Sequence, residues 1–372
     1  MRIETIAVHA GGDRDPSSRS VSPPIHLSTN YELGPGSVKL GGHIYTRYSN
    51  PTQDRLETAL AALEGGEAAL VFSSGVAAGA AVLQPLPDGS HVVFPDDVYY
   101  QFHAMAAEYL PRWGLDSSIV DMSDLDALAS ALRPTTKLVW AESPSNPLLK
   151  VVDLAAVAKL AREAGALSLV DNTFATPIAQ RPLELGFDLA LHSTTKYMGG
   201  HGDVQGGAVV FKRRDGFFDS VRRVREIQGA VASPFSSWLV LRGLRSLPCR
   251  VERHAANASA VATFLAKHTA VEAVHYPGLP EHPGHSVAKR QMKGFGGMLS
   301  FRVRGGAEKA IAVTSRTKLF VNATSLGGPE SLIEHRASSE GPQSTTPKNL
   351  LRLSVGLENA QDLVEDLAQA LA

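Results

Sequence analysis

The sequence predicts an α/β fold, with a mostly parallel central sheet covered by helices on both faces and a smaller α+β domain at the C-terminal end. From about residue 52 to about residue 235, short apolar runs alternate with helical segments, which is the pattern of parallel strands joined by crossover helices. After about residue 235 the pattern changes to long helices and a few separated strand-like runs. The 372 residues, 44% of them hydrophobic, suffice for two such cores.

The first 47 residues differ from the rest because they lack periodicity and are rich in Gly, Ser and Pro. Pro23-Pro24, Gly34-Pro35-Gly36 and Gly41-Gly42 interrupt any regular element. Ordering such a segment by itself costs conformational entropy, so we expect residues 1–47 to form an arm that contacts a neighbouring subunit. Residues 48–240 are then the large domain, and residues 241–372 are the small domain.

Helices and strands follow each other in order within the predicted large domain. A first helix with leucines on one face ends at Gly65-Gly66, a small-residue helix spans Val76–Leu83, and Asp153 begins a third helix. The predicted strands are Ala69–Phe72, His91–Phe94, Leu138–Ala141, Ala166–Val170, Asp188–Leu191 and Ala208–Phe211.

The predicted small domain begins with helices. Trp238, Leu241 and Leu244 recur at helical spacing, and a longer helix follows at about residues 251–268. Met298–Val303 and Leu350–Val355 are its clearest predicted strands.

Charge and cysteine content limit the partners and the compartment. The net charge of −1 and the pI near 6.9 predict no nucleic-acid and no anionic-membrane partner. No apolar run approaches the roughly 18 residues of a membrane span, and the first residues lack the basic-then-apolar pattern of a signal peptide. The single cysteine, Cys249, excludes an internal disulfide, so we expect a cytoplasmic protein. We also expect Cys249 to be a small core residue in a helix.

A lysine after one of the predicted strands is the strongest chemical signal. Lys196 ends the stretch His192-Ser193-Thr194-Thr195-Lys196, and Asp171 ends the preceding strand-like run. A lysine amine can condense with an aldehyde to give a Schiff base. Pyridoxal phosphate is the common biological aldehyde that is held in this way.

A pyridoxal-phosphate site needs three further groups, and each has a candidate. Asp171, at a strand end, is a partner for the pyridine nitrogen. Ser193 and Thr195 offer hydroxyls to the phosphate, and a helix that begins at Ser74-Gly75-Val76 offers backbone amides. Tyr99 follows another strand end and offers a ring for stacking.

Taken alone, each of these signals also has a common structural explanation that involves no cofactor. Most lysines are solvated, an aspartate at a strand end is often a cap, and Ser-Ser-Gly is usually a turn. Their combination in an α/β order favours a pyridoxal-phosphate site. No metal site is predicted.

Several motifs also resemble a known family. They are Tyr45-Thr46-Arg47-Tyr48-Ser49-Asn50-Pro51-Thr52, Glu142-Ser143-Pro144-Ser145-Asn146-Pro147, Val170-Asp171-Asn172-Thr173-Phe174, His192-Ser193-Thr194-Thr195-Lys196-Tyr197, Ser325-Leu326-Gly327-Gly328 and Leu351-Arg352-Leu353-Ser354-Val355-Gly356. In this order the chain resembles the cystathionine γ-synthase-like, or Cys/Met metabolism, family of pyridoxal-phosphate enzymes. The resemblance implies a fold-type I transferase, with pyridoxal 5'-phosphate as cofactor.

The resemblance assigns roles around the cofactor. It implies that Lys196 holds the cofactor and shuttles protons, that Asp171 pairs with the pyridinium, and that Tyr99 stacks on the ring and helps proton transfer. The residues that it implies for the phosphate are Ser193, Thr195, Gly75 and Val76, together with Tyr45 and Arg47 from the neighbouring subunit.

The resemblance also assigns roles toward a small amino-acid substrate. It implies that Arg352 binds the α-carboxylate, for which a bidentate guanidinium is suited. Ser325 would orient Lys196, and Asn146 would lie near the cofactor's ring oxygen and the substrate. The family implies a homotetramer, a dimer of dimers whose subunits share active sites.

Three positions depart from the family pattern. Ile44, Ala104 and Thr324 stand where members that handle cystathionine often carry an acidic residue, an arginine and a glutamate. These changes remove charge near the distal end of the substrate, which disfavours cystathionine and favours a smaller or less polar thioether. Residues 335–346 also replace the family's usual stretch. Two interpretations stay open here: substrate contacts through Arg336, Ser339 or Glu340, or an altered surface loop.

The sequence therefore predicts an enzyme that carries out pyridoxal-phosphate-dependent γ-elimination or γ-replacement on sulfur amino acids. It would resemble cystathionine γ-lyase or γ-synthase and act in transsulfuration or methionine metabolism. The alternatives are a methionine or homocysteine γ-lyase, an O-acyl-homoserine sulfhydrylase, a cystathionine β-lyase, and a protein that binds the cofactor without turnover.

Overall fold

A seven-stranded sheet, called here the large sheet, lies at the centre of the computed structural model, which describes residues 1–342 and 344–372. Neighbouring strands pair in parallel from β8 to β5, whereas β9 is antiparallel to both β3 and β8. In spatial order the strands are β3 (Ala68–Phe72), β9 (Gly207–Phe211), β8 (Leu189–His192), β7 (Leu167–Asp171), β6 (Thr136–Glu142), β4 (His91–Pro95) and β5 (Asp116–Val120). The predicted α/β class is confirmed.

The large sheet is buried on both faces because successive side chains of a strand point to opposite sides. In β3, Ala69 and Val71 belong to one apolar cluster and Leu70 and Phe72 to another. Helices α2 and α6 pack into the first cluster, and α3, α4 and α8 pack into the second. The bounds are α2 (Pro51–Glu64), α3 (Gly75–Leu83), α4 (Tyr100–Glu108), α5 (Leu125–Ala131), α6 (Leu154–Glu163), α7 (Thr176–Ala179) and α8 (Gly216–Gln228).

Local capping chemistry determines where several of these helices begin and end. Asn50 accepts a hydrogen bond from the Thr52 amide ahead of α2, and Asp153 accepts one from Ala156 ahead of α6. Gly65 ends α2 with a positive φ of 77°, a conformation that favours glycine.

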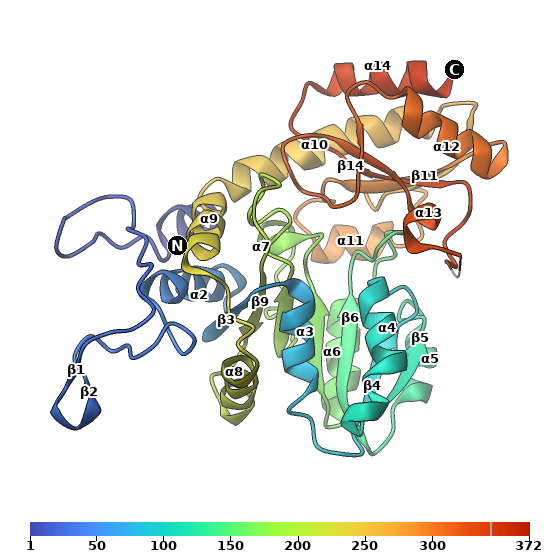
Figure 1. Cartoon of the computed structure of the whole chain (residues 1–372). Helices are drawn as coiled ribbons and strands as arrows, with labels where there is room; N and C mark the ends of the chain where they lie inside the picture. Colours follow the sequence, from blue (N-terminus) through green and yellow to red (C-terminus); the bar gives the residue numbers. More distant parts are fainter. Residues whose placement is uncertain (343) are drawn as a thin grey trace.

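A second sheet, called here the small sheet, is built from the C-terminal part of the chain and lies above the large sheet in Figure 1. Helices α10, α12 and α14 contribute to its apolar core. In spatial order its strands are β10 (Val271–His275), β11 (Met298–Val303), β14 (Leu350–Ser354), β13 (Leu332–His335) and β12 (Val321–Asn322). The helices of this part are α9 (Pro234–Leu244), α10 (Leu247–Leu265), α11 (His285–Gln291), α12 (Gly306–Arg316), α13 (Arg336–Glu340) and α14 (Ala360–Leu371).

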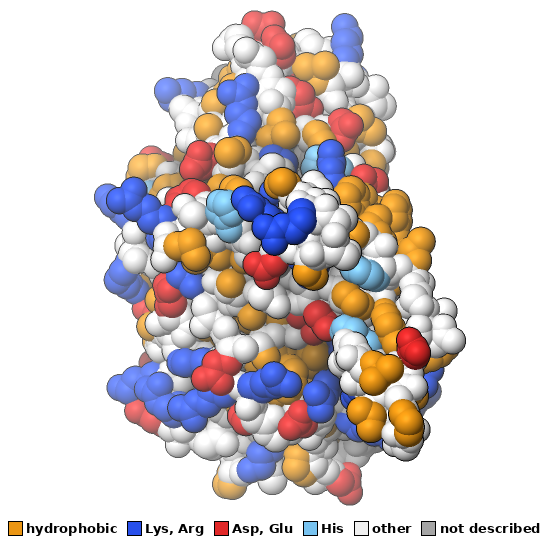
Figure 2. Space-filling model, turned by 90° about the vertical axis from the view of Figure 1, so that its left-hand side faces the viewer, with side chains coloured by type: hydrophobic (Ala, Val, Ile, Leu, Met, Phe, Trp, Pro, Cys, Tyr) orange, Lys and Arg blue, Asp and Glu red, His pale blue; other side chains and the backbone are white. Residues whose placement is uncertain are grey.

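The N-terminal segment projects from the rest of the chain (Figure 1). Helix α1 (Ile3–His9) packs against α2 and α10, and the following residues reach outward to a small hairpin of β1 (Leu33–Gly34) and β2 (Val38–Lys39). A short 3₁₀ turn joins the hairpin strands, and another follows α4. Figure 2 faces the side that carries this segment, where apolar side chains gather. Val21, Leu27 and Leu40 are 69%, 70% and 62% exposed, so none of the described residues covers them.

Several details differ from the expectations. Residues 1–47 were expected to lack regular structure and to contact a neighbouring subunit, but Ile3–His9 form α1, which packs on α2 and α10 of the same chain. Strand β5 was not predicted, because Asp116-Ser117-Ser118 opens it and polar residues are tolerated at the edge of a sheet. Cys249 lies in α10, as expected for a helical residue, but its side chain is exposed rather than in the core. None of the helices in the described residues is long and apolar enough to cross a bilayer.

Helix α9 packs directly on the turn that follows Lys196. A Cβ at Gly243 would overlap the carbonyl oxygens of Met198 and Gly199. Arg250 joins the same two segments, since it donates to the carbonyls of Tyr197 and Gly243, at 2.7 Å each.

Replacing Gly243 with alanine should therefore lower the free energy of unfolding by about 1–3 kcal/mol through overpacking. Urea denaturation measures this loss. Gly216→Ala is the matched control, since no atom lies within 4 Å of a Cβ there. Equal stability of the two variants would contradict the packing argument.

Candidate active site

A cavity lies where β6, β7 and β8 of the large sheet end, and residues near the small sheet line its other side. Ligands in open α/β sheets bind at this carboxyl edge. Of the residues predicted from the sequence, the cavity brings together Lys196, Asp171, Ser193, Thr195, Gly75, Val76, Tyr99, Asn146, Thr324, Ser325 and Arg352.

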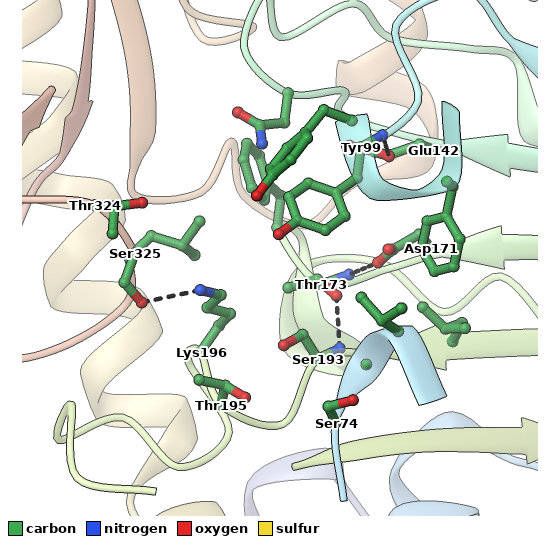
Figure 3. Close-up of a pocket in the computed structure, with 18 of the residues that line it drawn as sticks. Ser74, Tyr99, Glu142, Asp171, Thr173, Ser193, Thr195, Lys196, Thr324 and Ser325 are labelled. Carbon is green, nitrogen blue, oxygen red and sulfur yellow. Dashed lines mark hydrogen bonds between the residues drawn. The ribbon is translucent and has the colours of Figure 1, made fainter. Parts of the chain in front are cut away.

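Lys196 lies in the turn between β8 and β9, and its amine points across the cavity to Ser325 (Figure 3). The Nζ atom donates a hydrogen bond to Ser325 Oγ at 2.9 Å. Burial, and next the positive charge of Arg352, lower the pKa of Lys196 to about 8. Ser325 has a φ of 82°, an unusual value for a residue with a side chain, so its backbone is held in a strained conformation at this contact. The amine is thus both oriented and more easily deprotonated than a surface lysine.

Asp171 ends β7 and contributes a carboxylate to the cavity. It accepts a hydrogen bond from the Thr173 amide at 3.0 Å. Burial raises the pKa of Asp171, and none of the ion pairs among the described residues includes this carboxylate. A buried acid without a cationic partner is suited to a ligand that brings a positive charge.

The N-terminus of α3 and two hydroxyl residues form another side of the cavity (Figure 3). Ser74 caps α3 by accepting from the Ala77 amide at 3.1 Å. A Cβ on Gly75 would lie only 3.0 Å from the Ser193 side chain, so glycine lets the helix end approach that residue. Thr195 Oγ1 donates to the Gly206 carbonyl at 3.1 Å and accepts from its amide at 3.0 Å. Amides of a helix start beside hydroxyls are the groups that bind phosphate.

Tyr99 borders the cavity at the start of α4. Its amide donates to Glu142 Oε2 at 2.9 Å, and its ring lies 4.9 Å from that of Tyr100. Burial, and next Tyr100, raise the pKa of Tyr99 to about 12. Burial, and next Asp171, raise the pKa of Glu142 well above the usual range, which favours a neutral carboxyl. Tyr99 is therefore a protonated phenol at neutral pH.

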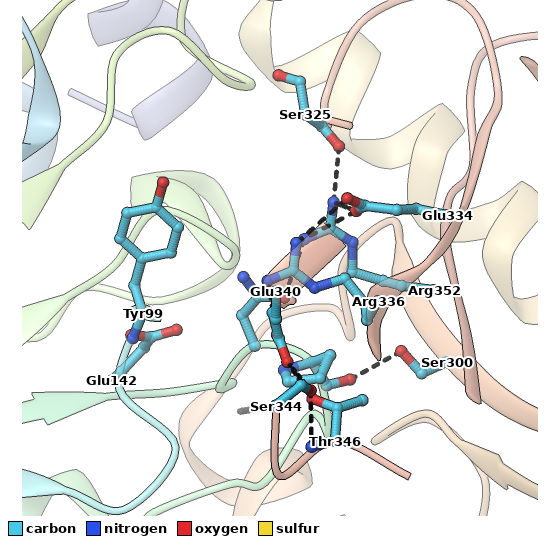
Figure 4. Close-up of polar contacts among 12 residues, drawn as sticks. Tyr99, Glu142, Ser300, Ser325, Glu334, Arg336, Glu340, Ser344, Thr346 and Arg352 are labelled. Carbon is cyan, nitrogen blue, oxygen red and sulfur yellow. Dashed lines mark hydrogen bonds and ion pairs between the residues drawn. The ribbon is translucent and has the colours of Figure 1, made fainter. Parts of the chain in front are cut away.

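Arg352 lies in β14 and is almost fully buried, with 4% of its side chain exposed (Figure 4). It forms an ion pair with Glu334 at 2.5 Å. It also donates to Asn146 Oδ1 at 3.0 Å and to the Ser325 carbonyl at 3.1 Å. Glu334 is the register partner of Arg352 in β13, so the pairing of the small sheet brings the two charges together.

Four predicted residues do not line this cavity within one chain. Ile44 lines a separate cavity beside the N-terminal segment, and Ala104 lies on α4. Tyr45 is 37% exposed, and the Arg47 guanidinium stacks 4.9 Å from its ring. The roles of Tyr45 and Arg47 toward a neighbouring subunit stay predictions.

No functional role was predicted from the sequence for Thr173, Glu142 or Glu334, and the role of Arg336 stayed open. Thr173 Oγ1 accepts from the Ser193 amide at 2.9 Å and thereby joins the ends of β7 and β8. The Asp-Asn-Thr motif contains Thr173 and was a usable signal. Glu334 had no such signal, because its position opposite Arg352 depends on strand pairing.

The donor set fits pyridoxal phosphate. The hydroxyls and the start of α3 suit its phosphate, Asp171 suits the ring nitrogen, Tyr99 offers a ring, and Lys196 offers an amine.

Comparison with known proteins also indicates pyridoxal phosphate as the cofactor. The family model described as "Cys/Met metabolism PLP-dependent enzyme" matches residues 4–372. The chain is 47% identical to cystathionine gamma-synthase of Mycobacterium tuberculosis (strain H37Rv), covering 99% of this chain and 96% of that protein. It is 42% identical to cystathionine gamma-lyase of Bacillus subtilis (strain 168), over 100% and 99% of the two chains.

A third relative and a solved structure complete the comparison. Cystathionine beta-lyase of Coxiella burnetii is 44% identical, over 99% of this chain and 97% of the relative. The crystal structure of metB from Corynebacterium glutamicum superposes with a TM-score of 0.97 at 41% identity, covering 100% and 98% of the chains. The chain therefore belongs to the Cys/Met metabolism family of pyridoxal-phosphate-dependent enzymes.

Proposed function

We propose that this enzyme catalyses γ-elimination or γ-replacement on a sulfur amino acid or an activated homoserine, as cystathionine γ-lyases and γ-synthases do. One observation carries the proposal: a single cavity holds a lysine amine of lowered pKa, a carboxylate without a cationic partner and a buried arginine. The relatives named cystathionine gamma-synthase and gamma-lyase support the same reaction class.

Each of the main residues of the cavity has a separate proposed role. When bound, pyridoxal phosphate supplies a ring that withdraws electrons from the substrate Cα. Asp171 keeps the ring nitrogen protonated, and Arg352 holds the substrate α-carboxylate. The Lys196 amine, freed by the substrate amine, takes the proton from Cα and acts as the general base. Tyr99 lines the same space and assists proton transfer.

The position of the second bond change then selects the product. Removal of a proton from Cβ allows a leaving group on Cγ to depart. Addition of a thiol at Cγ gives replacement, and hydrolysis of the unsaturated product gives a 2-oxo acid and ammonia. Loss of a group from Cβ would instead be the β-lyase reaction. This reaction is a further alternative, because one relative is named cystathionine beta-lyase.

We infer a homotetramer built from two dimers, in which the arm of residues 1–47 completes the neighbour's site. The uncovered apolar side chains of Val21, Leu27 and Leu40 support this proposal. Tyr45 and Arg47 would then reach the phosphate of the neighbouring site. We also propose that residues 48–240 form the large domain and residues 241–372 the small domain, and that the protein lies in the cytoplasm.

We further propose that Ile44, Ala104 and Thr324 bear on which substrate enters. Thr324 lines the cavity beside Ser325 and brings no charge. This favours an uncharged distal group at that wall, so methionine or homocysteine γ-lyase and O-acyl-homoserine sulfhydrylase activities remain the second candidates.

A substrate panel tests the reaction class. Purified holoenzyme should release 2-oxo acid or thiol from at least one of L-cystathionine, L-methionine, L-homocysteine, or an O-acylhomoserine supplied with cysteine. Lys196→Ala should lose the visible band of the lysine-bound cofactor and lower kcat by about a thousandfold, because it removes the general base. Full turnover by Lys196→Ala would refute the assignment, and a holoenzyme inert toward the whole panel would indicate cofactor binding without turnover.

Asp171→Asn should weaken cofactor binding. A charge-assisted hydrogen bond contributes about 1.5–3 kcal/mol, so the Kd for pyridoxal phosphate should rise about tenfold to a hundredfold. Equilibrium dialysis of the cofactor-free variant measures this change. Asp116→Asn, at an exposed edge strand, is the control and should leave the Kd unchanged.

Cofactor capture by the cofactor-free enzyme should accelerate as the pH rises and level off above about pH 8. Only the neutral amine of Lys196 is a nucleophile, and burial together with Arg352 lowers its pKa from 10.5 to about 8. Stopped-flow absorbance across this range gives the profile. A rate that follows an ordinary lysine pKa would contradict this prediction.

A further inference from the structure

Two buried acids end neighbouring strands at the edge of the large sheet that borders the active-site cavity. Glu142 ends β6 and Asp171 ends β7, and the two are register partners in the parallel pairing of these strands. Register partners extend their side chains from the same face of a sheet, and both residues line the cavity. Only 5% of Glu142 is exposed. The cavity therefore contains a second carboxyl group beside the one assigned to the ring nitrogen.

Glu142 holds the backbone of Tyr99. Its Oε2 atom accepts the Tyr99 amide at 2.9 Å (Figure 3), and the Tyr99 carbonyl accepts the Phe102 amide at 2.8 Å in the first turn of α4. Tyr99 is the N-cap residue of α4 and makes no capping hydrogen bond with its own side chain. The position of the phenol ring thus depends on its backbone, and Glu142 is the side chain outside α4 that holds this backbone.

The surroundings of Glu142 bring negative charge and no cation. None of the ion pairs among the described residues includes Glu142. A third acid, Asp97, also acts on it. Lys150, the cation that acts on Asp97, pairs instead with Asp96 and Asp121, at 2.8 Å and 3.0 Å. An ionised Glu142 would therefore be a buried charge without compensation, which is costly.

The pair of Glu142 and Asp171 accommodates one negative charge rather than two. Like charges at adjacent buried positions repel, so one of the two carboxyls keeps its proton. Burial, and next Asp171, raise the pKa of Glu142 well above its usual range. Burial also raises the pKa of Asp171, but hydrogen bonds from Thr173, and next the charge of His192, oppose that rise. Glu142 is the member that keeps the proton.

We propose that Glu142 is a positioning residue, which as a neutral carboxyl holds Tyr99 in place for stacking on the cofactor and leaves Asp171 as the single negative charge at the ring nitrogen. This inference rests on the proposed function and adds a residue to that site. A protonated carboxyl still has an oxygen that accepts an amide hydrogen. The protonated ring nitrogen carries one positive charge, which one carboxylate balances.

Two variants separate the hydrogen bond from the charge. Glu142→Gln keeps an acceptor oxygen without a charge, whereas Glu142→Leu removes every acceptor. The Kd of the cofactor-free enzyme for pyridoxal phosphate, measured by equilibrium dialysis at neutral pH, should stay within about threefold in Glu142→Gln and rise about tenfold in Glu142→Leu. A tenfold rise in Glu142→Gln would overturn the neutral state, and unchanged binding in Glu142→Leu would overturn the positioning role.

A double-mutant cycle shows whether Glu142 acts through Tyr99. In a Tyr99→Ala background the ring is absent, so Glu142→Leu should raise the Kd by less than about threefold further. The same tenfold rise in both backgrounds would contradict the proposal.

Asp366→Leu is the matched control variant. Asp366 is also 5% exposed and accepts the amides of Lys318 and Leu319, at 2.8 Å each, but it lies in α14 and does not line the cavity. Its loss should lower the thermal stability and leave the Kd unchanged. An equal rise of the Kd in Asp366→Leu would show a general effect of losing a buried acid and would overturn the positioning role.

The pH profile of cofactor binding gives a readout that a merely structural role would not affect. Acid should weaken binding as Asp171 gains a proton, and the midpoint pH should be the same in the wild-type protein and in Glu142→Gln. If Glu142 were ionised, its replacement would remove a negative neighbour of Asp171 and move the midpoint to lower pH. Such a shift would refute the neutral state.

Infrared difference spectroscopy detects the proton without turnover and without a destabilised variant. Wild-type holoenzyme at neutral pH should show the carbonyl band of a protonated carboxyl, and Glu142→Gln should lack this band. Identical spectra in that region would refute the neutral Glu142. A protein that met these expectations but converted no substrate of the panel would contradict only the proposed reaction.

Discussion

The buried pair of Arg352 and Glu334 is the interaction on which the architecture of the active site depends. It holds a positive charge in β14, the central strand of the small sheet, and ties that charge to Asn146, which follows β6 of the large sheet, and to the backbone of Ser325. Breaking one partner of a buried pair typically costs about 3–5 kcal/mol, because the other charge is left uncompensated. The two sheets are therefore coupled at Arg352, the residue that we propose binds the substrate carboxylate.

Burial then shifts the pKa values of the titratable groups in the cavity. Burial lowers the pKa of Lys196 and raises those of Asp171, Glu142 and Tyr99. The same low-polarity surroundings thus produce a lysine that is easily neutral, a phenol that keeps its proton and a carboxylate that lacks a cation until a ligand supplies one. Acid–base roles follow from position relative to water as much as from residue type.

The distribution of charge around the substrate differs from what the sequence alone indicated. Ile44, Ala104 and Thr324 are uncharged where members that handle cystathionine often carry charged residues. This difference predicted a less polar substrate. The loop with Arg336 and Glu340 brings charge back to the cavity from another segment.

Local pattern by itself determined the α/β class, most strand positions and the cofactor, and it predicted Lys196 as the lysine that would hold it. These signals are short-range: apolar runs, caps, and a lysine and an aspartate at the ends of consecutive predicted strands. Only the tertiary structure decided that β9 is antiparallel, that Glu334 faces Arg352 and that Arg336 borders the cavity. The physical reason is that these relations arise from strand pairing and packing between residues far apart in the chain, on which local propensity carries no information.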